Sequence, residues 1–118
     1  MKRAEEMLDA ASGNLEIGQY KTSLNRSYYA IFHAMRAANI LKGFDSSKHS
    51  GVIAFFNKEY LKENILDRNL SVIIKNSAFL REKSDYDDFY IASRKEAEKQ
   101  LKDAQVFLKA VEKYLDQQ

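Results

Sequence analysis

Two side chains with complementary chemistry, Arg26 and His33, lie seven residues apart in the stretch NRSYYAIFHAMR (residues 25–36). An imidazole can move protons near neutral pH, and a guanidinium fork can stabilise the charge that develops on a phosphate. Cleavage of an RNA phosphodiester by its own 2′-hydroxyl can use both groups without a metal ion. The pair is therefore a candidate for such cleavage. The simpler alternative is that Arg26 pairs with a carboxylate and His33 is a packed polar side chain.

One long predicted helix would place both side chains on the same face. At about 100° and 1.5 Å per residue, seven positions return almost to the starting azimuth about 10 Å along the axis. Tyr29 then lies between Arg26 and His33. Asn25 lies beside the start of this polar stripe, and Arg36 extends it by one turn. The neighbouring apolar face comprises Leu24, Tyr28, Ile31, Phe32 and Met35. A two-fold dimer would bring two such stripes into one cleft.

Three further residues are candidates for contacts with RNA or a nucleotide. His49 follows Ser-Ser-Lys near a predicted helix start, where backbone N–H groups favour anions. The simpler interpretation of His49, which we favour, is loop capping or packing. Arg81 could contact a phosphate, but we favour an ion pair with Asp85 and a buried Tyr86 ring, locking the fourth helix to the fifth. Tyr29 could stack on a base at the edge of the cleft.

The composition excludes several kinds of functional site. The 118 residues include no cysteine, which rules out disulfides, thiolate metal ligands and cysteine nucleophiles. Two histidines without a carboxylate motif predict no metal site, and no Gly-rich phosphate loop or other cofactor motif occurs, so we expect no cofactor. The net charge of +2 is mild, so RNA binding would depend on local clusters of positive charge.

No stretch of the sequence suggests export or membrane insertion. The apolar runs fall well short of the ~20 residues that cross a bilayer. The first residues, MKRAEEMLDAASG, contain acidic side chains and no apolar core of a signal peptide. We therefore expect a cytoplasmic protein without membrane contact.

The absence of proline and the presence of only four glycines favour an all-α fold. Apolar residues recur at helical spacing over about 2–17, 21–42, 49–62, from 67 up to a REKSDYDDFY connection (81–90), and 92–115. Gly18 and Gly43 are expected helix ends, while Thr22 or Ser23 and Asp67 are expected N-caps. Short connections predict an up-and-down bundle of four to five helices in a single domain, residues 1–118.

Three segments of the chain resemble the HEPN superfamily, the higher eukaryotes and prokaryotes nucleotide-binding domain. SLNRSYYAIFHAMRAANIL resembles the signature helix nRxYYAxFhA of the small stand-alone prokaryotic branch. KHSGVIAFF and LREKSDYDDFY resemble two further segments of that branch, in the same order along the chain. The resemblance extends over nearly the whole chain and implies a bundle of four to five helices that forms a homodimer.

Two functions follow from this resemblance. Many HEPN proteins are metal-independent endoribonucleases with an R-x(4–6)-H motif, which Arg26 and His33 match. His33 would transfer protons, Arg26 would stabilise phosphate charge, and Asn25 and Tyr29 would support them. Many of these ribonucleases carry Asn, Asp or His directly after the arginine, where this chain has Ser27. Alternatively, other HEPN proteins are non-catalytic partners of a minimal nucleotidyltransferase in toxin–antitoxin pairs, and some are proposed to bind nucleotides.

Overall fold

Six helical segments account for most of the chain in the computed structural model, which describes residues 1–118. They are α1 (Lys2–Glu16), α2 (Tyr20–Leu41), α3 (His49–Phe56), the π-helical segment η1 (Asn57–Leu61), α4 (Leu70–Tyr86) and α5 (Arg94–Asp116). η1 directly continues α3, so together they form the helix predicted over about 49–62. None of the helices combines the length and the hydropathy that crossing a lipid bilayer requires.

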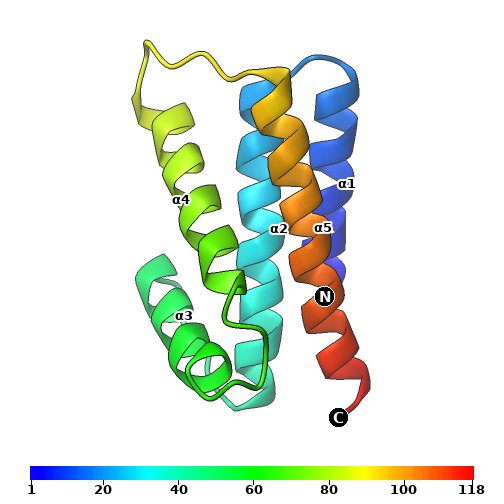
Figure 1. Cartoon of the computed structure of the whole chain (residues 1–118), viewed down its shortest axis with the longest axis vertical. Coiled ribbons are helices and arrows are strands. Elements are labelled where there is room, and N and C mark those ends of the chain that lie inside the picture. Colours follow the sequence, from blue (N-terminus) through cyan, green and yellow to red (C-terminus); the bar gives the residue numbers. More distant parts are fainter.

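The central element of the bundle is α2, which contacts α1, α3, α4 and α5. Figure 1 shows α1, α2, α4 and α5 running alternately up and down, with α3 beside the lower half of α2. The predicted all-α up-and-down bundle is confirmed. The expectation that all successive helices are antiparallel is wrong for α2 and α3. The connection 42–48 returns to the middle of α2, where His49 packs against Phe32, so α3 runs in the same direction as α2.

The core combines small residues on α2 with large rings from the surrounding helices. The smallest core residues of α2 recur every four positions and are fully buried: Ala30, Ala34 and Ala38. Side chains of this size let neighbouring helices approach closely. The ring of Phe56 lies 5.3 Å from that of Tyr60 and 5.5 Å from that of Phe107. The buried hydroxyl of Tyr60 donates a hydrogen bond to the carbonyl of Ala38, which joins η1 to α2.

The helix ends follow the predicted glycines but not the predicted caps of α2. Gly18 and Gly43 follow α1 and α2 with φ angles of +78° and +80°, a conformation in which glycine carries no steric penalty. Neither Thr22 nor Ser23 caps α2, because the helix already begins at Tyr20. Ser23 is instead fully buried, and its hydroxyl donates to the carbonyl of Ala11 on α1 at 2.9 Å.

The boundaries around α4 and α5 differ from the predicted ones by a few residues. Asp67 precedes α4 in a turn in which its carboxylate accepts from the Asn69 N–H, and the helix begins only at Leu70. The predicted connection 81–90 is too long at its start, because α4 continues to Tyr86. α5 begins at Arg94, after a capping box in which Ser93 and Glu96 satisfy each other's backbone N–H groups.

Candidate functional site

The polar stripe predicted on α2 lies on the part of this helix that its neighbours leave partly uncovered. Arg26, Tyr29, His33 and Arg36 are each half-buried. The predicted apolar face is confirmed, because all of its members are buried: Leu24, Tyr28, Ile31, Phe32 and Met35. The helix therefore separates its packing residues from a row of polar side chains that remain accessible.

Both histidines of the chain pack against the same two aromatic rings of α2. The His33 ring lies 5.5 Å from that of Phe32 and 6.3 Å from that of Tyr29, measured between centroids. His49, the first residue of α3, lies 4.3 Å from Phe32 and 5.7 Å from Tyr29. The fold thus brings together two histidines that are sixteen positions apart in sequence. We refer to these four residues and Tyr28 as the histidine cluster.

Tyr28 fixes the orientation of His49 within the cluster. Its hydroxyl oxygen lies at hydrogen-bond distance, 2.9 Å, from Nδ1 of His49. Burial raises the pKa of the Tyr28 phenol, although the charge of Arg81 lowers it, so the hydroxyl stays protonated at neutral pH. Burial, and then the charge of Arg81, lower the pKa of His49. His49 therefore packs, as expected, and its Nδ1 is directed toward Tyr28.

Arg81 of α4 flanks the histidine cluster. Its Nη2 donates to the Tyr29 hydroxyl at 3.2 Å, and its guanidinium lies 5.3 and 5.6 Å from the ring centroids of Tyr28 and Tyr29. Its Nε also lies 3.2 Å from a carboxylate oxygen of Asp85, an ion pair without hydrogen-bond geometry. The prediction that Arg81 and Tyr86 hold the fourth helix against the fifth is wrong. Arg81 faces α2 and joins α4 to it, whereas the Tyr86 side chain is 74% exposed.

His33 also borders an open pocket of about 720 Å³, which we call the His33 pocket. Its lining residues are Met1, Arg3, His33, Arg36, Ala37, Ile40 and Leu115. None of them carries a carboxylate side chain. Burial, followed by the charges of Arg3, Arg36 and His49, lowers the pKa of His33, so its imidazole is mainly neutral at pH 7. Arg36 is held by two hydrogen bonds, of 3.0 and 2.8 Å, to the carboxylate of Asp45.

Arg26, the other member of the predicted pair, forms a hydrogen bond with its sequence neighbour Asn25. Its Nη1 donates to Oδ1 of Asn25 at 2.5 Å, and no hydrogen bond or ion pair joins Arg26 to His33. Ser27 is fully buried in the bundle, and its hydroxyl has no hydrogen-bond partner. The residue after the arginine therefore contributes nothing to the accessible polar stripe.

The structure unites four of the seven predicted site residues in one place: Tyr29, His33, His49 and Arg81. Sequence reasoning missed two contributors. Arg3 reaches the His33 pocket because α1 runs antiparallel to α2, a pairing that the short loop after Gly18 indicates. Tyr28 belongs to the core, as predicted, but its hydrogen bond to His49 depends on a loop path that no local pattern specifies. No group of three or more His, Asp or Glu side chains forms a possible metal site.

Comparison with known proteins gives one family and several relatives. The family model for the HEPN domain matches residues 1–114. A Methanocaldococcus jannaschii protein named "Putative toxin" is 33% identical over 115 residues, 98% of this chain and 78% of that protein. A second protein of that organism with the same designation is 35% identical over 112 residues, 95% and 83% of the two chains. A Thermotoga maritima "UPF0332 protein" is 32% identical over 115 residues, 98% and 87%.

Proposed function

This chain belongs to the HEPN domain family, and from that premise we propose that it is a metal-independent endoribonuclease acting as a homodimer in the cytoplasm. In this proposal, His33 transfers protons at the scissile phosphodiester and Arg26 stabilises the negative charge of the transition state. Asn25 and Tyr29 position these groups or the RNA. The 2′-hydroxyl of the substrate is the nucleophile, so the protein supplies no covalent intermediate.

The observation that carries the proposal is the environment of His33. Its neutral imidazole borders an open pocket in which Arg3 and Arg36 supply positive charge and no lining residue supplies a carboxylate. Asp45 offsets part of the charge of Arg36, but Arg3 forms no ion pair. Such a site attracts a phosphate while it keeps the nearby base unprotonated. These are the conditions that abstraction of a 2′-hydroxyl proton requires.

Two further arginines lie near the accessible polar stripe. Arg26 lies two turns before His33 on α2, and Arg81, whose charge Asp85 offsets in part, packs on the rings of Tyr28 and Tyr29. Several phosphates of one RNA strand could contact these arginines at the same time. Because each such contact releases counterions, we expect RNA binding to weaken strongly as the salt concentration rises.

The names of the relatives support a biological role for this activity. Two of them are called "Putative toxin", and their sequences align with nearly the whole of this chain. We therefore propose that the protein is the toxin of a toxin–antitoxin pair whose other member is a minimal nucleotidyltransferase. RNA cleavage would be the toxic activity, and the partner protein would restrain it.

Two observations favour an alternative, a non-catalytic module that binds a nucleotide or the nucleotidyltransferase through the same surface. Arg26 is hydrogen-bonded to Asn25 and forms no hydrogen bond or ion pair with His33, and Ser27 is buried where many HEPN ribonucleases carry a more polar side chain. Under this alternative, the arginines of the site hold phosphate groups, and His33 is a binding residue. Loss of His33 would then weaken binding without any reaction to abolish.

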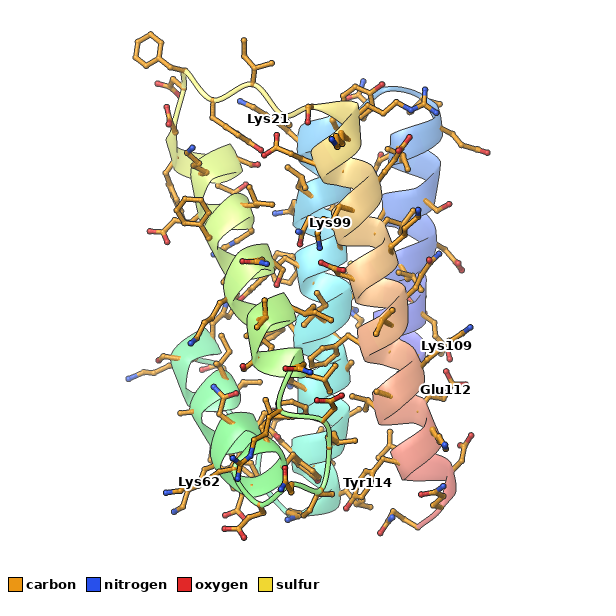
Figure 2. The ribbon with its side chains drawn as sticks, viewed as in Figure 1. Lys21, Lys62, Lys99, Lys109, Glu112 and Tyr114 are labelled. Atoms are coloured by element: carbon orange, nitrogen blue, oxygen red, sulfur yellow. The ribbon has the colours of Figure 1, made fainter.

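Incubation of the purified protein with end-labelled single-stranded RNA in EDTA tests the proposal. Wild type should produce fragments ending in a 2′,3′-cyclic phosphate and a 5′-hydroxyl. His33→Gln and Arg26→Gln should each lower the rate by about 100-fold or more. Lys109→Ala is a matched control, because Lys109 lies on the side of α5 away from α3 and α4 (Figure 2) and lines no part of the His33 pocket.

The same experiment separates the two functions. If wild type cleaves none of a broad set of RNAs, the ribonuclease proposal fails, and retained binding of labelled RNA or nucleotide would support the alternative. Cleavage that His33→Gln leaves unchanged would also contradict the proposal, provided that circular dichroism shows a folded variant. Light scattering of the purified chain measures the oligomeric state, and a monomer at micromolar concentration would contradict the homodimer.

A further inference from the structure

Cleavage of RNA by its 2′-hydroxyl requires two proton transfers. The 2′-hydroxyl loses a proton as its oxygen forms a bond to phosphorus, and the bond from phosphorus to the 5′-oxygen breaks. The departing 5′-oxygen must then gain a proton, so that the products are a 2′,3′-cyclic phosphate and a 5′-hydroxyl. Within one protomer, a neutral His33 can accept the first proton but leaves the second transfer without a donor. The proposed function therefore requires a proton donor, which either a second group of the same protomer or the second site of the homodimer can supply.

The chain has only two histidines, and the fold packs both against the rings of Phe32 and Tyr29. They reach these rings from different elements, His33 from the middle of α2 and His49 from the first turn of α3. Each ring lies against Phe32, at 5.5 and 4.3 Å, and both lie within 6.3 Å of Tyr29. A positive charge on His49 also lowers the pKa of His33.

We propose that His49 is the second proton-transfer group of this site, giving its Nε2 proton to the departing 5′-oxygen while His33 accepts the proton of the 2′-hydroxyl. This inference rests on the proposed ribonuclease activity and assigns a chemical role to a residue outside the Arg26–His33 pair. The two imidazoles exchange protonation states in one turnover. Water restores the original states when the products leave.

Tyr28 is the positioning residue for His49. A protonated His49 carries hydrogen on both ring nitrogens, and its Nδ1–H can donate to the Tyr28 oxygen 2.9 Å away. Nε2–H is then the free proton, on the side of the ring opposite the tyrosine. Tyr28 is 2% exposed, so its hydroxyl has little competition from water and holds the imidazole in one orientation.

The charged groups around the two histidines oppose protonation of both rings at once. Arg3 of α1 and Arg36 of α2 act on His33, and Arg36 is itself paired with Asp45. Arg81 of α4 acts on His49. With arginines on both sides and each imidazole repelling a charge on the other, full protonation of the pair is disfavoured. A pair with one proton has one base and one acid, as the reaction requires.

A substrate whose leaving group needs no proton tests this role directly. The cleavage site is mapped with wild type, and an RNA is then made with sulfur in place of the 5′-bridging oxygen at that linkage. A thiolate leaves without general-acid help. His49→Gln should cleave ordinary RNA about 100-fold more slowly than wild type but should cleave the sulfur-containing RNA within about fivefold of the wild-type rate.

Two further variants keep the test decisive. His33→Gln should remain slow on both substrates, because the 2′-hydroxyl still needs a base. Tyr28→Phe should lose about tenfold on ordinary RNA and recover on the sulfur-containing RNA, since it affects only the orientation of His49. A general loss of structure would slow both substrates equally, so selective recovery is not produced by misfolding.

The outcomes distinguish this inference from the proposed function. If wild type cleaves neither RNA, the ribonuclease proposal fails, and the role of His49 fails with it. If wild type cleaves RNA and His49→Gln does so equally well, only the role of His49 is overturned. A folded His49→Gln that is equally slow on both substrates would also overturn it. Recovery by His33→Gln in place of His49→Gln would reverse the two roles and contradict the assignment.

Discussion

The hydroxyl of Tyr29 on α2 accepts a hydrogen bond from Nη2 of Arg81 on α4 at 3.2 Å, across 52 residues of sequence. The same guanidinium lies over the rings of Tyr28 and Tyr29. One side chain therefore links the position of α4 to the shape of the histidine cluster. A change in the packing of α4 would be transmitted to His49 through Tyr28.

This link predicts the effect of replacing Arg81 by methionine, which keeps most of the side-chain length. The variant loses the hydrogen bond, both cation–π contacts and the ion pair with Asp85, so the free energy of unfolding should fall by about 1–2 kcal/mol. Urea denaturation followed by circular dichroism measures the change. Arg94→Met is the matched control. It removes an ion pair with Glu98 that is exposed to solvent, so it should leave the free energy of unfolding nearly unchanged. Equal effects of the two substitutions would contradict the proposed link.

The hydrogen bond between Tyr28 and His49 predicts a specific effect of Tyr28→Phe. The ring remains in the core while the hydroxyl is lost, so the free energy of unfolding should fall by about 0.5–1.5 kcal/mol. The ¹⁵N chemical shifts of the His49 ring should change, because Nδ1 loses its partner, whereas those of His33 should change little. Tyr86→Phe removes an exposed hydroxyl without a hydrogen bond and serves as the control. Unchanged His49 shifts in Tyr28→Phe would show that the bond is absent in solution.

Adjacent residues on α5 provide a matched pair for testing the core. Phe107 is fully buried against Phe56, whereas Val106 is 55% exposed. Phe107→Ala should lower the free energy of unfolding by about 3–5 kcal/mol, because it removes a buried ring and leaves a cavity. Val106→Ala should change it by less than about 0.5 kcal/mol. Denaturant titration of both variants measures the contrast, and a small effect of Phe107→Ala would contradict the packing of its ring against Phe56 of α3.

Much of the fold follows from local patterns in the sequence. Helical periodicity and two glycines define α1 and α2, because these signals act within a few residues. The caps were harder to predict, because Ser23 is equally suited to a helix start and to a buried bond with α1. Ser93 and Glu96 have the spacing of a capping box, which is a local signal for the start of α5. The predicted end of α4 is wrong because charged residues such as Glu82 and Lys83 fit an exposed helix face as well as a connection.

The candidate site was only partly predictable, because it depends on paths that no local pattern fixes. Helical spacing correctly placed Tyr29 and His33 on one accessible stripe of α2. The packing of His49 against Phe32 and Tyr29 depends on how the connection 42–48 turns back along α2. The contact of Arg81 with Tyr29 depends on the rotation of α4 about its axis. A helical wheel of α4 places Arg81 on the same side as the buried Ile74, which was a usable but weak indication.

The lowered pKa values of both histidines predict how stability depends on pH. Burial is the largest cause at each ring, followed by Arg3 at His33 and by Arg81 at His49. A histidine in the unfolded chain binds its proton near pH 6.5, whereas these two bind it only at lower pH when folded. Between those values the unfolded state holds more protons, so the free energy of unfolding decreases as the pH falls. The contribution of neutral histidines is complete above about pH 6.5 and is lost progressively below it.

Denaturant titrations between pH 8 and pH 5 should therefore show a decline that begins near pH 6.5 in wild type. The double variant His33→Gln/His49→Gln should show a flatter curve over this range, because carboxylates such as that of Asp45, whose pKa the Arg36 hydrogen bond lowers, titrate at more acidic pH. NMR titration should place both imidazole midpoints below 6.5. Arg3→Ala should raise the midpoint of His33 and leave that of His49 nearly unchanged, whereas Lys2→Ala should move neither. A His33 midpoint at or above 6.5 in wild type would contradict the arrangement of burial and arginines around this site.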